Sequence, residues 1–166
     1  MSSFPGDKKE VISNLQSATI MAIEIDSQLY YLPQVDLITF ENTSQLGEAL
    51  KDGKSVASVE FAGKYIPIYC LSKDFDLLNY IPANRKVCVI TGYKERRFAI
   101  LCDKIKKLSY SEIKFEPVPL CMESHTTPLS SLFLYRKDTG ETELGMLLRS
   151  QTLFDYLQSD LQFEAA

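Results

Sequence analysis

Short runs in which apolar and polar residues alternate, each closed by turn-forming residues, follow one another about 8 to 12 residues apart along this chain. In the segment 55–61, polar residues separate Ala57, Val59 and Phe61, which is the period of two that a half-buried strand shows. Many short strands with only brief helices between them indicate a barrel or a sandwich rather than a parallel sheet. We therefore predict a mainly β fold, in which the halves before and after about residue 82 each close a small barrel.

Paired segments joined by short turns predict four antiparallel hairpins. Their strands are expected at 19–25 and 28–32, at 55–61 and 65–71, at 87–91 and 97–101, and at 131–135 and 143–148. The third hairpin then has a loop that runs from Gly92 to Arg96. Pro67 cannot donate a ladder hydrogen bond, so its strand is expected at a sheet edge or at a bulge.

The two ends of the chain differ from this pattern. Residues 1–16 mix Ser, Pro, Gly and charged residues, so we expect a mobile N-terminal tail there. The folded domain is predicted over residues 17–158, and residues 159–166 are predicted to form a C-terminal tail.

Charge and hydropathy exclude several classes of protein. The net charge is −4 and the sequence pI is near 5.1, which argues against nucleic-acid binding, and the one basic cluster, Lys94 with Arg96 and Arg97, is too small to change this. No apolar run approaches the roughly 20 residues of a membrane-spanning helix, and the first ten residues lack the apolar stretch of a secretion signal. We therefore expect a soluble, cytoplasmic protein with no direct membrane insertion.

The sequence offers few groups that could perform catalysis. Its single histidine, His125, lies four residues after Cys121, and no second Cys or His pair is placed to complete a zinc site. Three of the four cysteines lie in apolar runs and are expected as buried thiols. Asp103 ends a predicted strand and is interpreted as fixing a turn by accepting hydrogen bonds from the following amides. No glycine spacing of a phosphate-binding loop is present, so we expect no catalytic residue, metal or cofactor, and a function in binding.

Three stretches of the chain resemble the CheW family, whose members couple chemoreceptors to the kinase CheA. The resemblance as a whole covers about residues 19–157. The first is the hairpin that opens at residues 22–25 and the Tyr-Leu-Pro at 31–33, followed by Leu37 and Phe40. The second and most specific, at 59–71, is similar to the family's strand, Arg-Gly turn and Val-Pro-Val strand. The third, at 97–105, matches a family strand that ends in Asp and has an apolar residue two positions later, here Ile105.

The resemblance implies two small SH3-like β-barrels packed through a shared apolar core, with short helices. It also implies two partners. The tip of a methyl-accepting chemoreceptor would dock in the groove between the barrels, and the regulatory domain of a CheA-type histidine kinase would meet the barrel ends. By position, Leu37 and Phe40 would line the groove from the first barrel and Ile105 from the second, with core packing as the alternative for each.

The chain departs from the family at the turn of Ala62 and Gly63, because family members often carry an Arg before this glycine and use its charge for partner contacts. This turn and the long connection 117–130 make the chain more similar to accessory CheW-like proteins, such as those of pilus-associated systems that control twitching motility. Two alternatives remain open. One is a β-barrel module that binds nucleic acid or a nucleotide, and the other is an enzyme that depends on Cys121 and His125.

Overall fold

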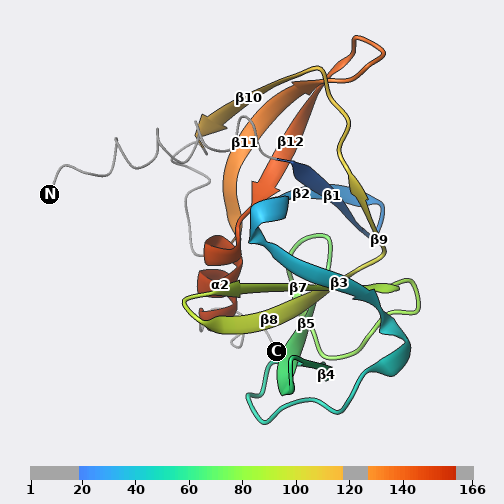
Figure 1. Ribbon diagram of the computed structural model, residues 1–166, viewed down its shortest axis with the longest axis vertical. Helices are drawn as coiled ribbons and strands as arrows, with labels where there is room; N and C mark the ends of the chain where they lie inside the picture. The colour runs from blue at the N-terminus through green and yellow to red at the C-terminus, as the bar shows by residue number, and fades with distance from the viewer. Residues whose placement is uncertain (1–18, 118–126, 160–166) are drawn as a thin grey trace, which may run out of the picture.

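The computed structural model describes residues 19–117 and 127–159, which fold into two curled six-stranded sheets and a short helix (Figure 1). Sheet A has the strand order β10 (Glu112–Pro117), β11 (Leu129–Arg136), β12 (Thr142–Leu148), β2 (Gln28–Pro33), β1 (Ile20–Ile25) and β9 (Lys104–Lys107). Sheet B has the order β3 (Leu37–Asn42), β7 (Val87–Tyr93), β8 (Arg96–Cys102), β5 (Lys64–Leu71) and β4 (Ala57–Phe61), and β6 (Leu77–Leu78) pairs with β5. The prediction of a mainly β fold is confirmed.

The chain passes between the sheets twice within the described strands. It leaves sheet A after β2 through the 3-10 turn η1 (Gln34–Asp36), and it returns from β8 to β9 through Asp103. Each sheet therefore takes strands from both sides of residue 82, and the strand order does not follow the division expected there. A parallel pairing of Leu147 in β12 with Tyr31 in β2 joins the two parts of sheet A.

Alternation along the strands sorts the buried residues into three clusters. The cluster enclosed by sheet A contains Ile20, Ala22, Tyr31, Phe115, Phe133, Tyr135 and Leu147. The cluster enclosed by sheet B contains Ala57, Val59, Ile66, Ile68, Cys70, Cys88, Ile90, Ala99 and Leu101. A third, which we name the shared cluster, contains Ile23, Ile25, Tyr30, Leu32, Tyr69, Leu71, Phe75, Val89, Phe98, Ile100, Cys102 and Leu148 with Leu153, Tyr156 and Leu157 of helix α2 (Ser150–Gln158). The opposite faces of each sheet thus serve different cores.

Three hairpins turn through two residues that both have positive φ, the geometry that best fits the twist of paired strands. These pairs are Asp26 and Ser27, Ala62 and Gly63, and Lys94 and Glu95. The third turn is shorter than the predicted loop from Gly92 to Arg96. Gly92 still pairs with Arg97, and Tyr93 pairs with Arg96, so the strands continue almost to the tip.

The expectation that Pro67 lies at a sheet edge or at a bulge is wrong, because β5 is an inner strand that pairs with both β4 and β8 and keeps a regular register with β4. Pro67 faces Ser58, whose amide and carbonyl bond Gly47 on the outer side of β4. The nitrogen of Pro67 consequently points toward β8, and the pairing of β5 with β8 begins only at Ile68. Pro67 thus occupies a site where no ladder donor is required.

Candidate partner-binding surface

The first crossing between the sheets is held by Asp36. One carboxylate oxygen, Oδ2, accepts hydrogen bonds from Arg149 Nε at 2.7 Å and from the backbone nitrogen of Ser150 at 3.0 Å. The carbonyl of Asp36 accepts a hydrogen bond from the Thr91 hydroxyl at 2.6 Å. These contacts tie η1 to the start of α2 and to β7, and so fix the backbone that leads into Leu37.

The second crossing is held by Arg85, which is 2% exposed. Its Nη1 donates to Asp26 Oδ1 at 2.7 Å and to Asp103 Oδ1 at 2.8 Å, while Nη2 donates to Asp26 Oδ2 and to the Leu71 carbonyl, both at 3.0 Å. Asn84 Nδ2 bridges the same two carboxylates at 2.9 and 3.0 Å. One guanidinium thus joins the β1–β2 turn, the end of β5 and the crossing after β8.

The electrostatics of this cluster are mutually reinforcing. Hydrogen bonds from Arg85, and then from Asn84, hold the pKa of the Asp26 carboxyl well below its ordinary value. The hydrogen bond to Asp26 in turn raises the pKa of Arg85, against the opposing effect of burial. Asp26 and Arg85 are therefore both charged across the physiological range, and their ion pair links the two sheets throughout it.

The interpretation of Asp103 as a local turn former is wrong. Its Oδ2 accepts a hydrogen bond from the Asp26 amide at 2.8 Å, and its own amide donates to the Glu24 carbonyl at 2.8 Å. Asp103 thus contacts a hairpin far away in sequence rather than the amides that follow it. Sequence reasoning missed Arg85, because an arginine in a polar loop before a strand ordinarily lies in solvent.

A β-bulge in β3 sets the directions of Leu37 and Phe40. Leu37 faces Thr91 and Phe40 faces Val89, but the register shifts between Leu37 and Thr39, which leaves Ile38 as the additional residue. Residues that face each other across a pair lie on the same side of the sheet, and Val89 belongs to the shared cluster. Leu37 and Phe40, three residues apart, therefore point to the same side, whereas a regular strand would point them to opposite sides.

Ile105 reaches the same region from the other sheet. It faces Ile23 across the β1–β9 pair, and Ile23 is a fully buried member of the shared cluster. Ile105 and Leu37 are both half-buried and pack against this cluster. Leu37 and Ile105 thus pack against one cluster from different sheets, and Phe40 lies on the same side of β3 as Leu37. We name the surface formed by Leu37, Phe40 and Ile105 the β3–β9 surface.

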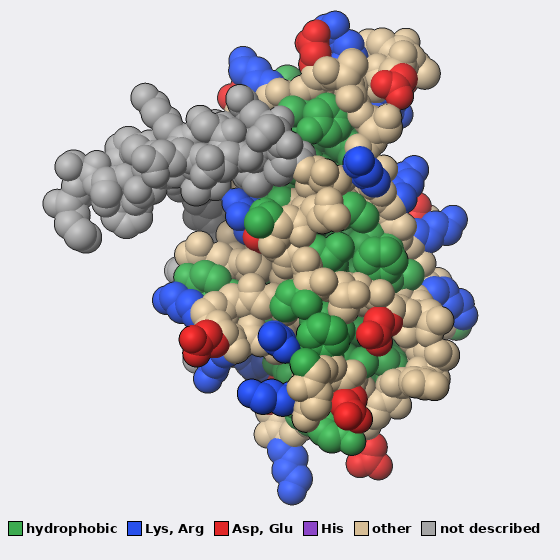
Figure 2. Space-filling view, in the orientation of Figure 1, with side chains coloured by type: hydrophobic (Ala, Val, Ile, Leu, Met, Phe, Trp, Pro, Cys, Tyr) green, Lys and Arg blue, Asp and Glu red, His purple; other side chains and the backbone are tan. Residues whose placement is uncertain are grey.

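The residues on and next to the β3–β9 surface differ in how much of each side chain is exposed to solvent. Phe40 is 47% exposed, and its neighbours Val35 and Ile38 are 75% and 43% exposed. Hydrophobic side chains gather along the middle of the face over which β3 and β9 run, with charged side chains among them (Figure 2). Leu37 and Ile105 thus pack mainly into the core, and of the three residues of the β3–β9 surface Phe40 is the most exposed.

Lysines flank Ile105 along β9, which is an edge strand of sheet A. Lys104, Lys106 and Lys107 are all exposed. Charged side chains on an edge deter pairing with a further strand, so a partner at this edge meets side chains rather than backbone. The arrangement suits a docked helix better than an added strand.

Comparison with solved structures identifies the fold of this chain. The structure is similar to the crystal structure of the scaffolding protein TtCheW from Thermoanaerobacter tengcongensis, with a TM-score of 0.58 and 14% sequence identity over 79% of this chain and 88% of that chain. No family model and no curated protein sequence matches the chain. The chain has a CheW-like fold. The curled sheets thus correspond to the two barrel-like subdomains of the CheW scaffold, as the resemblance in sequence implied.

In this CheW-like fold, the remaining predicted residues lie on other elements than β3 and β9. Ala62 and Gly63 form the exposed turn between β4 and β5, and β4 lies at the opposite end of sheet B from β3 in the strand order. Their φ values of 52° and 79° are both in the left-handed region. Ala62 accepts a conformation that glycine adopts more readily, at a cost of about 1 kcal/mol.

The thiols of the CheW-like fold are structural where they are described. Cys70, Cys88 and Cys102 are free and buried, as predicted, and burial raises the pKa values of Cys88 and Cys102 to about 12. Cys121 and His125 lie outside the described residues. Within residues 19–117 and 127–159, no three His, Cys, Asp or Glu side chains gather as a metal site. No helix in the same ranges is long and apolar enough to cross a membrane.

Proposed function

We propose that this protein is a non-catalytic, CheW-like adaptor that works in the cytoplasm and couples a methyl-accepting chemoreceptor to a CheA-type histidine kinase. The proposal is supported by the fold, which it shares with a bacterial scaffolding protein. It is also supported by the three stretches of sequence that resemble the CheW family.

The observation that carries the proposal is the bulge in β3. It turns Phe40 to the side of β3 on which Leu37 meets the shared cluster, against which Ile105 packs from sheet A, and Phe40 is about half exposed there. An exposed aromatic side chain supported by buried apolar neighbours has the composition of an interaction hot spot. We assign the chemoreceptor tip to this β3–β9 surface.

Preorganisation makes a small surface adequate for signalling. The Asp36 and Arg85 clusters fix the backbone at both crossings, directly before Leu37 and shortly before Ile105. A rigid surface loses little conformational entropy on binding, so more of the contact energy appears as affinity. Transient signalling contacts need only about 1,200 Å² or less of buried area.

The kinase is assigned to the barrel ends, including the turn of Ala62 and Gly63. This turn is exposed and belongs to the hairpin of β4 and β5, which contributes no residue to the β3–β9 surface. The absence of an arginine at Ala62 predicts weaker kinase binding than in family members that carry one. Ala62→Arg is therefore expected to strengthen kinase binding and to leave receptor binding unchanged.

Binding assays with purified components test the proposal. The protein is titrated with a helical hairpin fragment of a chemoreceptor tip from the same organism, as wild type, as Phe40→Asp and as the control Leu144→Asp. Leu144 is 60% exposed on β12 and lies outside the β3–β9 surface. Phe40→Asp is expected to weaken binding about 10-fold or more, and Leu144→Asp to leave it unchanged. Equal affinities for all three proteins would refute the assignment.

We further propose that the protein belongs to a pilus-associated chemosensory system that controls twitching motility. Loss of the gene is then expected to abolish twitching and to spare flagellar swimming, and restoration by the wild-type gene but not by Phe40→Asp would link the phenotype to the β3–β9 surface. Normal twitching in the deletion strain would exclude this narrower role and would leave the adaptor proposal in place.

A further inference from the structure

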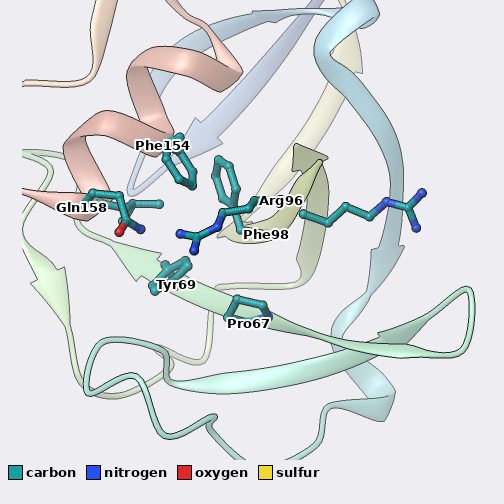
Figure 3. A pocket seen from close by; sticks show the side chains of 8 residues that line it. Pro67, Tyr69, Arg96, Phe98, Phe154 and Gln158 are labelled. Carbon is teal, nitrogen blue, oxygen red and sulfur yellow. The ribbon is translucent and has the colours of Figure 1, made fainter. Parts of the chain in front are cut away.

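A second concave site lies away from the β3–β9 surface, between α2, β5 and the first residues of β8. The pocket has a volume of about 250 Å³. Figure 3 shows Tyr69, Phe98 and Phe154 around it, and Pro67, Arg96, Arg97, Leu157 and Gln158 also line it. Pockets for whole small molecules usually occupy about 300 to 1,000 Å³, so this one suits one or two inserted side chains.

Aromatic rings form the walls of the pocket. The ring centroids of Tyr69 and Phe98 are 6.4 Å apart at 63°, and those of Phe98 and Phe154 are 6.2 Å apart at 47°. The Tyr69 hydroxyl donates a hydrogen bond to Asp52 at 2.7 Å, which holds the ring in place. Tyr69 and Phe98 are 6% and 4% exposed, whereas Phe154 is half-buried, so a further aromatic ring would contact mainly Phe154 and the accessible edges of the other two rings.

Arg96 supplies a positive charge inside this aromatic frame. Its guanidinium carbon lies 5.8 Å from the centroid of the Phe154 ring, and the side chain extends into the pocket toward Tyr69 and Gln158 (Figure 3). Over the described part of the chain, no carboxylate forms an ion pair with Arg96. The charge is thus available to an anionic group, while the amide of Gln158 offers a further hydrogen-bond donor.

The surroundings of the pocket reinforce this positive character. Lys94 and Arg97 flank the same hairpin tip and contact the rings of Tyr93 and Phe61. Asp52, the acid bonded to Tyr69, already accepts hydrogen bonds from the amides of Lys54 and Ser55. Glu95 in the turn and Asp155 on α2 are the other acids on these elements, and both are exposed. The net charge of the chain is −4, so the three neighbouring cations Lys94, Arg96 and Arg97 give this part of the surface a local positive charge that favours an anionic ligand.

We propose that this pocket binds an acidic peptide segment of a partner protein, with an aromatic side chain of the peptide inserted between Tyr69, Phe98 and Phe154. A carboxylate next to the inserted residue pairs with Arg96 and accepts a hydrogen bond from Gln158. A peptide is favoured over a nucleic acid because the protein is acidic overall and its group of three cations is small. The proposal does not depend on the chemoreceptor or the kinase.

Titration followed by amide NMR of the full chain tests the proposal, with the capped peptide Glu-Glu-Phe-Glu-Glu as the probe. Shifts are expected at Phe98, Phe154 and the Gln158 side chain. The peptides Glu-Glu-Ala-Glu-Glu and Lys-Lys-Phe-Lys-Lys are expected to bind at least 10-fold more weakly. Loss of either preference would overturn the proposal, since the first tests the aromatic anchor and the second the charge.

Variants locate the binding site on the protein. Arg96→Ala is expected to weaken binding of Glu-Glu-Phe-Glu-Glu at least 10-fold, and the control Arg136→Ala, an exposed arginine of sheet A, to leave it unchanged. Equal effects of the two substitutions would contradict the assignment. Two further outcomes would also overturn it. One is tighter binding of a single-stranded oligonucleotide at the same residues, and the other is peptide binding that appears only after residues 160–166 are removed, which would assign the pocket to that segment.

Discussion

The guanidinium of Arg85 lies 2.8 Å from the carboxylate of Asp103 at the point where the chain returns from sheet B to sheet A. The same guanidinium binds Asp26 in the first hairpin of sheet A, so one buried cation joins both sheets. Asp36 and Arg149 perform the equivalent role at the first crossing. The relative position of the two sheets, and with it the β3–β9 surface, thus depends on two arginine–carboxylate clusters as well as on apolar packing.

Removal of Arg85 is expected to destabilise the protein strongly. Arg85→Ala leaves the carboxylates of Asp26 and Asp103 close together without their shared cation, and breaking a buried pair in this way typically costs about 3 to 5 kcal/mol. The control Arg136→Ala removes an exposed pair with Glu112 and is expected to cost about 1 kcal/mol or less. Urea unfolding of both variants measures the difference, and similar midpoints would show that the cluster contributes little.

The same cluster predicts how stability changes in acid. The pKa of Asp26 is lower in the folded protein than in the unfolded chain, so its ionisation stabilises the fold fully above about pH 4. This contribution is lost progressively as the pH falls below that value. Asp26→Asn is therefore expected to be less stable than wild type at pH 7, with a smaller difference at pH 2. A difference that stays constant between these pH values, measured by urea unfolding, would contradict the assignment.

A side chain at Gly145 is expected to destabilise the fold, because a Cβ atom there would clash with three atoms of the Phe133 ring. Phe133 is fully buried and faces Gly145 across the β11–β12 pair. Gly145→Ala is expected to lower the free energy of unfolding by about 1 to 3 kcal/mol through overpacking. Leu144→Ala, at the exposed neighbouring position, is expected to change it by about 0.5 kcal/mol or less. Equal stabilities by thermal unfolding would show that the sheet relaxes around Phe133.

The hairpins could be predicted from sequence, because alternation and turn residues are local signals. The bulge at Ile38 could not be, since it follows from how β3 meets β7 and leaves no local signature. The burial of Arg85 was equally hidden, because its partners Asp26 and Asp103 come together only when both sheets have formed. Leu37, Phe40 and Ile105 were identified from the family resemblance, and only the strand registers show that Leu37 and Phe40 lie on one side of β3 and that Ile105 faces the buried Ile23.

Leu37 and Phe40 are expected to respond differently to the same substitution. Leu37 packs against the shared cluster, so Leu37→Asp is expected to lower stability by about 1 to 3 kcal/mol. Phe40 is about half exposed, and Phe40→Asp is expected to change stability by about 0.5 kcal/mol or less. Thermal unfolding distinguishes the two. If Phe40→Asp were as destabilising as Leu37→Asp, Phe40 would be a core residue and could not serve as the binding anchor.

The adaptor role is tested most directly by recruitment of a CheA-type kinase to vesicles that carry the cognate chemoreceptor. The kinase is expected to sediment with the vesicles when this protein is present and to remain in the supernatant when the protein is omitted or replaced by Phe40→Asp. Kinase sedimentation that is the same with and without the folded wild-type protein would contradict the account.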